Sequence, residues 1–277
     1  MRIDSHQHYW QYDPIRNSWI DESMKILRSD FLPENLKPIL DLNNINGSVA
    51  VQAGQSEDET LFLLNLAEKN DFIKGVVGWI DLRAENLEER LEFFSSYKKL
   101  VGMRHIVQSE PDDFMLGEEF QRGISKLEKF GLTYDILVFP TQLKASVELV
   151  QKFPEQAFVL DHIAKPYIKD GKIDQWAKDL YELAKFPNVV CKVSGMLTEA
   201  DLNHWKREDF IKYLDVVFNL FGSDRIMYGS DWPVCLLAAQ YEEQLDILES
   251  YISPFSSEEK TKIMGGNAIR FYILNGE

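Results

Sequence analysis

Cysteine is scarce in this chain: its 277 residues include only two, Cys191 and Cys235, far apart in the sequence. This count excludes a small secreted fold held together by several disulfides, so we expect both thiols to pack in the interior. Long apolar runs are also missing. No stretch reaches the roughly 18 apolar residues of a membrane-spanning helix, and no basic segment followed by an apolar one opens the chain. We therefore expect no signal peptide, no transmembrane helix and a cytoplasmic location.

Basic residues are outnumbered, with 30 Lys and Arg against 45 Asp and Glu and a formal net charge of −15. Such a surface repels nucleic acid and anionic membranes, so we expect neither as a partner. A hydrophobic content of 45% and an aromatic content of 12% exclude a disordered chain. Since barrels of alternating strands and helices often reach this length as one unit, we predict a single domain over residues 1–277.

Short apolar segments alternate with longer amphipathic ones along the whole chain. Several of the short segments are almost entirely apolar, as expected for a parallel sheet covered by helices. The predicted strands are Arg2–His8, Gly47–Ala53, Gly75–Leu82, Val101–Val107, Leu132–Val138, Ala157–His162, Val189–Val193 and Arg225–Gly229. The predicted helices are Glu57–Asn70, Glu85–Tyr97, Glu118–Phe130, Gln142–Phe153, Asp174–Phe186, Arg207–Phe221 and Tyr241–Tyr251.

Eight strands alternating with helices predict an α/β fold, a (β/α)8 TIM barrel. A doubly wound open sheet is the rival, but no Gly-x-Gly-x-x-Gly follows the first strand, which weakens its dinucleotide-binding version. One segment does not fit the alternation. Tyr9–Phe31 is long and rich in aromatic residues, and long loops in compact domains tend to be functional. We expect this segment to form a lid or a pocket wall over the first strand.

Histidine is rare, yet two of the five histidines, His6 and His8, lie two apart at the end of the first predicted strand. Alternation along a strand turns both side chains to one face. His162 and Asp231 stand at the ends of strands six and eight, where TIM barrels carry their active sites. These four side chains suit one divalent metal ion, zinc first among the candidates. The alternatives are a structural core role for His162 and a turn-forming role for Asp231.

Other polar and aromatic side chains at strand ends are candidate substrate ligands. Arg104 and His105 are neighbours on strand four, so a regular strand turns only one of them into the barrel mouth, and Arg104 could equally form a structural ion pair. Tyr134 and Asp135 on strand five pose the same question. The further candidates for substrate binding are Gln52, Trp79, Trp10 and Trp232, although a tryptophan in the position of Trp79 is more often a core residue.

With these residues, the chain resembles the amidohydrolase superfamily, in its amidohydrolase-2 branch. Within that branch it is similar to the sugar-lactone hydrolases that act on L-fucono- and L-rhamnonolactones. The resemblance covers nearly the whole length and depends on seven segments in order. They are Asp4–Trp10, Val51–Ala53, Val77–Leu82, Gly102–Gln108, Leu160–Pro166, Lys192–Gly195 and Tyr228–Pro233.

The resemblance implies hydrolysis of a small-molecule sugar lactone. It implies that Asp231 deprotonates the attacking water, that His6, His8 and His162 bind a metal together with Asp231, and that Arg104 lies beside the substrate oxygens. The ends of strands four and five offer no lysine to bridge two metals, so we expect one metal at most. The resemblance also implies that the metal can be dispensable. Without a metal, the three histidines would bind the substrate carbonyl directly as hydrogen-bond donors.

Two other functions are also compatible with the sequence. A metal-dependent decarboxylase would share the same branch of the superfamily, and a non-catalytic binding barrel would share the fold. The chain also leaves open a homo-oligomer.

Overall fold

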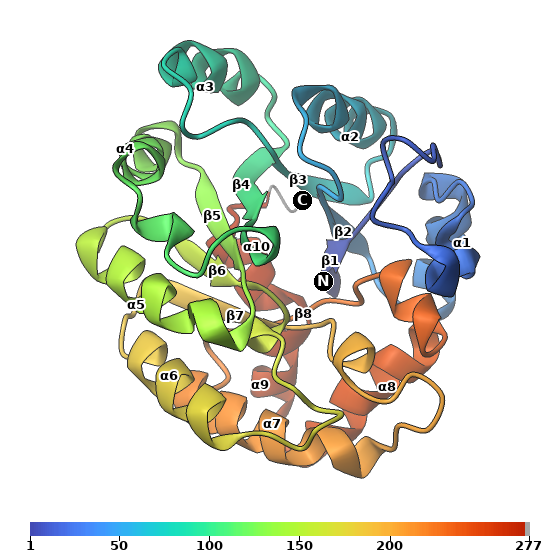
Figure 1. Cartoon of the computed structure of the whole chain (residues 1–277). Coiled ribbons are helices and arrows are strands. Elements are labelled where there is room, and N and C mark those ends of the chain that lie inside the picture. The colour runs from blue at the N-terminus through green and yellow to red at the C-terminus, as the bar shows by residue number, and fades with distance from the viewer. Residues whose placement is uncertain (275–277) are drawn as a thin grey trace.

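The computed structural model, which describes residues 1–274, is a ring of eight parallel strands surrounded by helices (Figure 1). The strands pair in sequence order, each with the next along the chain. They are β1 (Ile3–Gln7), β2 (Gly47–Val51), β3 (Ile73–Gly78), β4 (Leu100–Ile106), β5 (Thr133–Leu137), β6 (Phe158–Leu160), β7 (Val189–Val193) and β8 (Ile226–Tyr228). The predicted (β/α)8 barrel is therefore confirmed.

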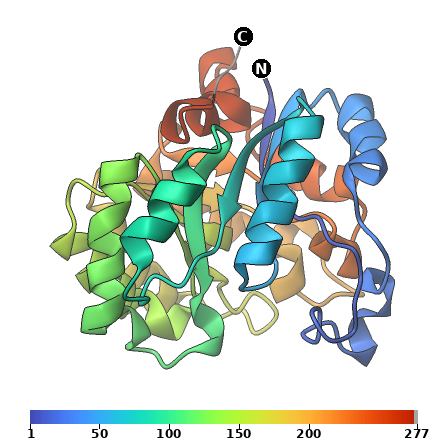
Figure 2. The same cartoon turned by 90° about the horizontal axis from the view of Figure 1, so that it is seen from above.

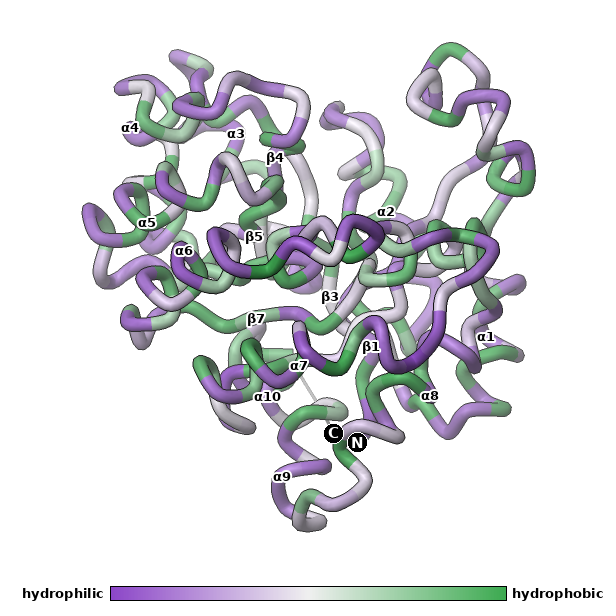
Figure 3. Tube along the Cα trace, turned by 60° about the horizontal axis from the view of Figure 1, so that its bottom comes forward, coloured by the Kyte–Doolittle hydropathy of each residue, from purple (hydrophilic) through white to green (hydrophobic). Residues whose placement is uncertain are grey.

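The helices cover the outside of the ring, and most turn one apolar face to the strands, so that hydrophilic and hydrophobic residues alternate along them in Figure 3. Their bounds are α1 (Pro33–Leu42), α2 (Glu57–Lys69), α3 (Leu87–Ser95), α4 (Glu118–Leu127), α5 (Leu143–Lys152), α6 (Asp174–Ala184), α7 (Arg207–Phe221), α8 (Tyr241–Tyr251), α9 (Ser257–Thr261) and α10 (Asn267–Phe271). No helix in residues 1–274 is long and apolar enough to cross a membrane.

The seven predicted helices are present as α2–α8, and α1, α9 and α10 are additions to them. Pro33 opens α1 at its first turn, where a proline is tolerated, but Pro38 stands inside it and hides the helix from a pattern search. Strand β6 is shorter than the predicted Ala157–His162. The chain leaves the strand after Leu160 because residues 162–165 adopt positive φ angles of 45–60°.

The barrel interior has two ends of different composition. At the amino ends of the strands, aliphatic side chains such as Val49, Val159 and Val190 form a core that α10 closes with Ala268. In Figure 2, α9 and α10 (red) lie at the end of the barrel where the N-terminus is drawn, and the loop that follows β1 (dark blue) lies at the other end. The second end is the one where the predicted site residues gather.

The ring closes between β1 and the segment that follows β8. The Asp231 N–H donates to the carbonyl oxygen of His6 (2.8 Å), and the His8 N–H donates to the carbonyl oxygen of Trp232 (2.7 Å). The seam therefore joins the backbones of four predicted site residues, His6, His8, Asp231 and Trp232, at one end of the barrel.

Candidate active site

Three imidazole nitrogens converge on one carboxylate oxygen at this end of the barrel. The Oδ1 atom of Asp231 lies 3.2 Å from His8 Nε2, 3.8 Å from His6 Nε2 and 3.9 Å from His162 Nε2. All four side chains are buried, with at most 4% of each residue exposed. The structure thus brings together the four residues that the sequence singled out, from β1, from the turn after β6 and from the turn after β8.

Each imidazole is oriented by a bond at its other nitrogen. His8 Nδ1–H donates to the carbonyl oxygen of Val51 (2.7 Å), and His162 Nδ1 shares a hydrogen bond with Ser194 Oγ (2.9 Å). His6 Nδ1 lies 3.2 Å from Asp161 Oδ1. With the three Nδ1 atoms held in this way, the three Nε2 atoms are the ones that face Asp231.

The turns that carry His162 and Asp231 are strained. Both residues have a positive φ, 53° and 58°, and Ile163 follows at 49°, a conformation that β-branched residues rarely adopt. Gly195 makes room for the first turn, because a Cβ there would lie 2.4 Å from His162 Nδ1. Strained backbone of this kind is typical of functional sites, where surrounding structure holds it in place.

Burial decides the charge of the cluster. It lowers the pKa of His6 and His162 well below their usual value, so both imidazoles are neutral at neutral pH. Burial alone would raise the pKa of Asp231, but His162 and His8 reverse this and lower it. The site therefore combines an ionised carboxylate with the two neutral imidazoles of His6 and His162, which is the state that a general base and metal ligands require.

An ionic network lies directly beneath the cluster. Asp161 contacts three nitrogens: Arg104 Nη1 at 2.9 Å, Lys192 Nζ at 3.1 Å and His6 Nδ1 at 3.2 Å. Lys192 also pairs with Asp135 (2.6 Å), which accepts a further hydrogen bond from the Tyr272 hydroxyl (2.6 Å). Burial would raise the pKa of Asp161, but Lys192, His6 and Arg104 hold it well below its usual range.

Arg104 is the member of the Arg104–His105 pair that faces the interior. Its Nη2 atom donates to the side-chain oxygen of Gln52 (2.9 Å) and to the Gln52 carbonyl, and its Nη1 atom lies 3.1 Å from His6 Nε2. The guanidinium therefore links the ends of β1, β2 and β4. Gln52, predicted as a substrate ligand, uses its side chain to hold Arg104.

His105 faces the opposite side of β4. It accepts a hydrogen bond from the Trp79 indole (3.2 Å), contacts Glu110 (3.0 Å) and stacks on Phe114. Trp79 and His105 thus contact each other, and the structure does not bring them into the histidine cluster; their role in substrate binding stays a prediction.

Tyr134 was predicted as a substrate ligand, and the structure places it elsewhere. It packs with Phe120 and Phe158 in the layer between the strands and the helices, while Asp135 faces the barrel interior. The physical reason is the alternation of side chains along β5, which sends neighbours to opposite faces. Trp232 is also only 2% exposed and packs against Tyr9 and Phe31, and so supports the loop over the mouth.

Strand alternation in the sequence contains a signal for the ionic network. Asp161 and Lys192 follow the inward-facing Val159 and Val190 by two residues each, so strand alternation places them on the interior face. A lysine within an otherwise apolar strand requires a buried partner of opposite charge, and Asp161 and Asp135 are those partners.

The donor set fits a divalent cation. Ligand atoms of His6, His8 and Asp231 lie within 4.8 Å of one another, and His162 Nε2 adds a fourth donor on the same carboxylate. Ligands at about 2.0–2.2 Å from zinc in a tetrahedral site lie roughly 3.3 Å apart. The Oδ1 atom of Asp231 lies at similar distances, 3.2–3.9 Å, from the three Nε2 atoms. Neutral imidazole and carboxylate are ligands that zinc accepts.

The amidohydrolase family model matches residues 3–274, and the chain belongs to this family. Among its relatives is an L-fucono-1,5-lactonase of Burkholderia multivorans, 41% identical over 99% of this chain and 96% of that protein. A second L-fucono-1,5-lactonase, of Burkholderia ambifaria, is 32% identical over 99% of this chain and 96% of that protein.

A solved structure shows the same fold at high similarity. The crystal structure of an amidohydrolase from Burkholderia multivorans with bound zinc has a TM-score of 0.95, is 40% identical and is covered over 99% of both chains.

Proposed function

We propose that this protein is a hydrolase that opens the ring of a sugar-acid lactone, an aldonolactone such as L-fucono-1,5-lactone. One observation carries the proposal: three imidazoles converge on one aspartate carboxylate within a family member 41% identical to an L-fucono-1,5-lactonase. A lactone is an activated ester, and one positioned base with groups that polarise the carbonyl is enough to hydrolyse it.

In the proposed reaction, Asp231 accepts a proton from water as the water oxygen bonds to the lactone carbonyl carbon. The tetrahedral intermediate then breaks its bond to the ring oxygen, and Asp231 returns the proton to that oxygen, so that the product is the open hydroxy acid. A divalent cation held by His6, His8, His162 and Asp231 would polarise the carbonyl. Arg104, 3.1 Å from His6 Nε2, adds a positive charge beside the developing oxyanion.

The experiment is a panel of aldonolactones assayed by acid release, with Asp231→Asn beside the wild type. We expect turnover by the wild type and a loss of about 10²–10⁴-fold in kcat for the variant, because a general base contributes about that factor. Asp41→Asn, which changes an exposed aspartate paired with Lys37 on α1, is the matched control and should leave kcat unchanged. Turnover of no lactone, with decarboxylation of an aromatic acid, would contradict the proposal.

Metal content is tested separately, by metal analysis of the purified protein and by zinc titration of the apoprotein. We expect one equivalent of a divalent metal per chain. A protein that keeps full activity after complete metal removal would show that the histidines act on the carbonyl directly.

A further inference from the structure

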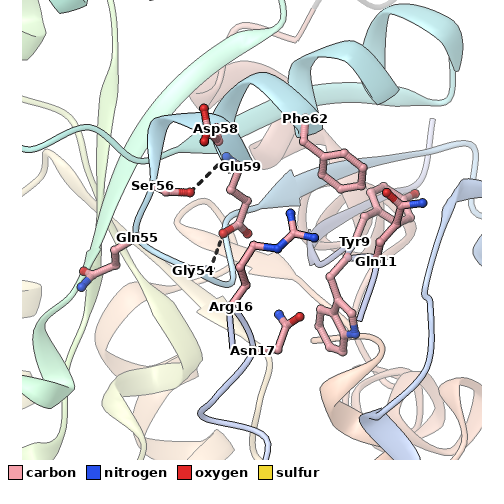
Figure 4. A pocket seen from close by; sticks show the side chains of 11 residues that line it. Tyr9, Gln11, Arg16, Asn17, Gly54, Gln55, Ser56, Asp58, Glu59 and Phe62 are labelled. Atoms are coloured by element: carbon pink, nitrogen blue, oxygen red, sulfur yellow. Dashed lines mark hydrogen bonds between the residues drawn. The ribbon is translucent and has the colours of Figure 1, made fainter. Parts of the chain in front are cut away.

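A cavity of about 410 Å³ lies between the loop that follows β1 and the start of α2 (Figure 4). Tyr9, Trp10 and Phe62 supply aromatic surface to it, and Arg16 and Asn17 supply polar groups. Figure 4 shows the Arg16 guanidinium extending into the space between Glu59 and Tyr9. The cavity therefore combines aromatic faces with hydrogen-bonding groups, as sites for sugars do.

The cavity is continuous in the chain with the cluster. Tyr9 and Trp10 directly follow His8, and Gly54, which also lines the cavity, stands two residues after Gln52. Two extended residues span only about 7 Å. Since Gln52 contacts Arg104 and His8 contacts Asp231, the cavity lining begins within two residues of side chains that contact the cluster or its arginine.

Arg16 is the arginine whose guanidinium is free to bind a ligand. The guanidinium groups of the other nine arginines each donate a hydrogen bond to the protein, whereas that of Arg16 makes no hydrogen bond or ion pair with residues 1–274. A guanidinium carries five donors in a fixed fork. In this cavity that whole set remains available.

Asn17 and Gln55, two amides that line the cavity, also have unpaired donor groups within residues 1–274. The side-chain oxygen of Asn17 accepts from the Asp13 N–H (2.9 Å), and that of Gln55 accepts from the Ile106 N–H (2.8 Å). Each amide oxygen is thus engaged with the backbone, and each NH₂ group has no protein acceptor within residues 1–274. The polar wall of the cavity consequently offers donors, which suits the oxygen atoms of hydroxyl groups.

The charges of the cavity select a neutral ligand. Among residues 1–274, Asp58 and Glu59 line it together with one cation, Arg16, and Glu59 is held in place by the N–H groups of Ala53 and Gly54, both at 2.6 Å. A phosphorylated sugar would place its dianion against two carboxyl groups and one guanidinium, which is unfavourable. A polyol has no such charge.

We propose that this cavity binds the hydroxylated end of a neutral, unphosphorylated aldonolactone, with Arg16 donating hydrogen bonds to its hydroxyl oxygens and thereby determining specificity. The inference rests on the proposed function, since it assumes a lactone carbonyl at the histidine cluster. Arg16 acts at a distance from the reacting bond, so its contribution belongs to binding and to substrate choice.

The test compares Arg16→Met with the wild type on two substrates, L-fucono-1,5-lactone and the unsubstituted δ-valerolactone. We expect kcat/KM for the sugar lactone to fall about 10- to 100-fold in the variant, mostly through KM, because hydrogen bonds to a charged donor are lost. For δ-valerolactone we expect a change of less than about twofold, since it has no hydroxyl to bind.

Arg28→Met is the matched control. Arg28 lies on the same loop but pairs with Glu22 and with the Ile20 carbonyl outside the cavity. If the loop only needs an arginine for its stability, both variants will lose activity equally on both substrates. Gln55→Glu is a second variant, which keeps the acceptor for the Ile106 N–H and replaces the free NH₂ group by a carboxylate oxygen; it should show the same selective loss.

The outcomes separate the two proposals. A wild type that hydrolyses neither lactone overturns the proposed function. A wild type that hydrolyses the sugar lactone, with an Arg16→Met variant that keeps the wild-type preference between the two substrates, overturns only the role of the cavity.

Discussion

The two halves of the barrel interior have opposite chemistry although the same strands build both. The half at the amino ends of the strands is aliphatic and closed by α10, and the half at the carboxyl ends holds Asp135, Asp161, Lys192, Arg104 and His6. Strand β7 passes from one to the other within two residues, from Val190 to Lys192. Both halves are almost fully inaccessible to solvent.

The difference shows where stability comes from and where function comes from. Aliphatic packing contributes roughly 25 cal/mol per Å² of buried apolar surface, whereas buried ion pairs gain little over apolar residues of the same volume. The charged half is tolerated because its two carboxylates and two cations are balanced and hydrogen-bonded. Such an arrangement positions His6, which an apolar filling could not do.

The largest effect should follow from breaking that balance. Lys192→Met removes the cation shared by Asp161 and Asp135, and we expect it to lower the free energy of unfolding by about 3–5 kcal/mol. Urea denaturation measures the loss. The double variant Lys192→Met/Asp135→Asn should recover part of it, and a double variant no more stable than the single one would contradict the balance argument.

A substitution in the aliphatic half should affect stability alone. Met227 belongs to that core, and Met227→Ala should cost about 2–5 kcal/mol by leaving a cavity. At a temperature where the variant is folded, its kcat/KM on a sugar lactone should equal that of the wild type. A large fall in kcat with unchanged stability would show that the two halves are not separable.

Two fully buried aspartates allow a comparison by pH. Cations hold Asp161 ionised, whereas Asp4 accepts hydrogen bonds from the Ser230 N–H (2.9 Å) and the Tyr241 hydroxyl (3.1 Å), and burial raises its pKa to about 6. In the unfolded chain Asp4 ionises near 3.8, so between these two values the folded state holds a proton that the unfolded state has lost.

Asp4 therefore adds stability that is full below about pH 3.8 and is lost as the pH rises through about 6. The change is about 3 kcal/mol, from roughly 1.4 kcal/mol per pKa unit. The difference in unfolding free energy between wild type and Asp4→Asn, measured by denaturation across this range, should fall by that amount. A difference independent of pH would contradict it.

The smallest expected effect concerns metal affinity. Asp161 orients His6 through Nδ1 at 3.2 Å, and loss of such a support reduces metal affinity about 10- to 100-fold. Zinc titration of Asp161→Asn against a chromophoric chelator measures this, with Asp41→Asn as the control. Equal affinities for wild type and Asp161→Asn would show that His6 needs no support from this carboxylate.

Much of the fold and of the cluster could be predicted because both follow from local patterns. Apolar runs gave the eight strands, and polar residues at their ends gave His6, His8, His162 and Asp231. What escaped prediction depends on contacts between distant segments. The partners of Lys192 come from β5 and from the turn after β6, and no periodicity in the sequence reports which carboxylates those are.

The choice between neighbours on a strand stayed open for a different reason. Arg104 or His105, and Tyr134 or Asp135, are equivalent in a pattern until the start of the strand is fixed to one residue. Alternation from Val101, which belongs to the interior cluster with Val159 and Val190, would turn His105 inward. The pairing of β3 with β4 shifts by one residue between Leu100 and Gly102, and Arg104 is therefore the residue that faces the interior.

The seam between β1 and the turn after β8 has a consequence for biosynthesis. His8 and Asp231 meet across 223 residues, so the site needs both ends of the barrel. During translation from the amino end, every nascent chain that has not yet reached Asp231 carries its histidine pair without the carboxylate. On the proposed mechanism such a chain lacks its general base, and catalysis begins only when the ribosome has released almost the whole polypeptide.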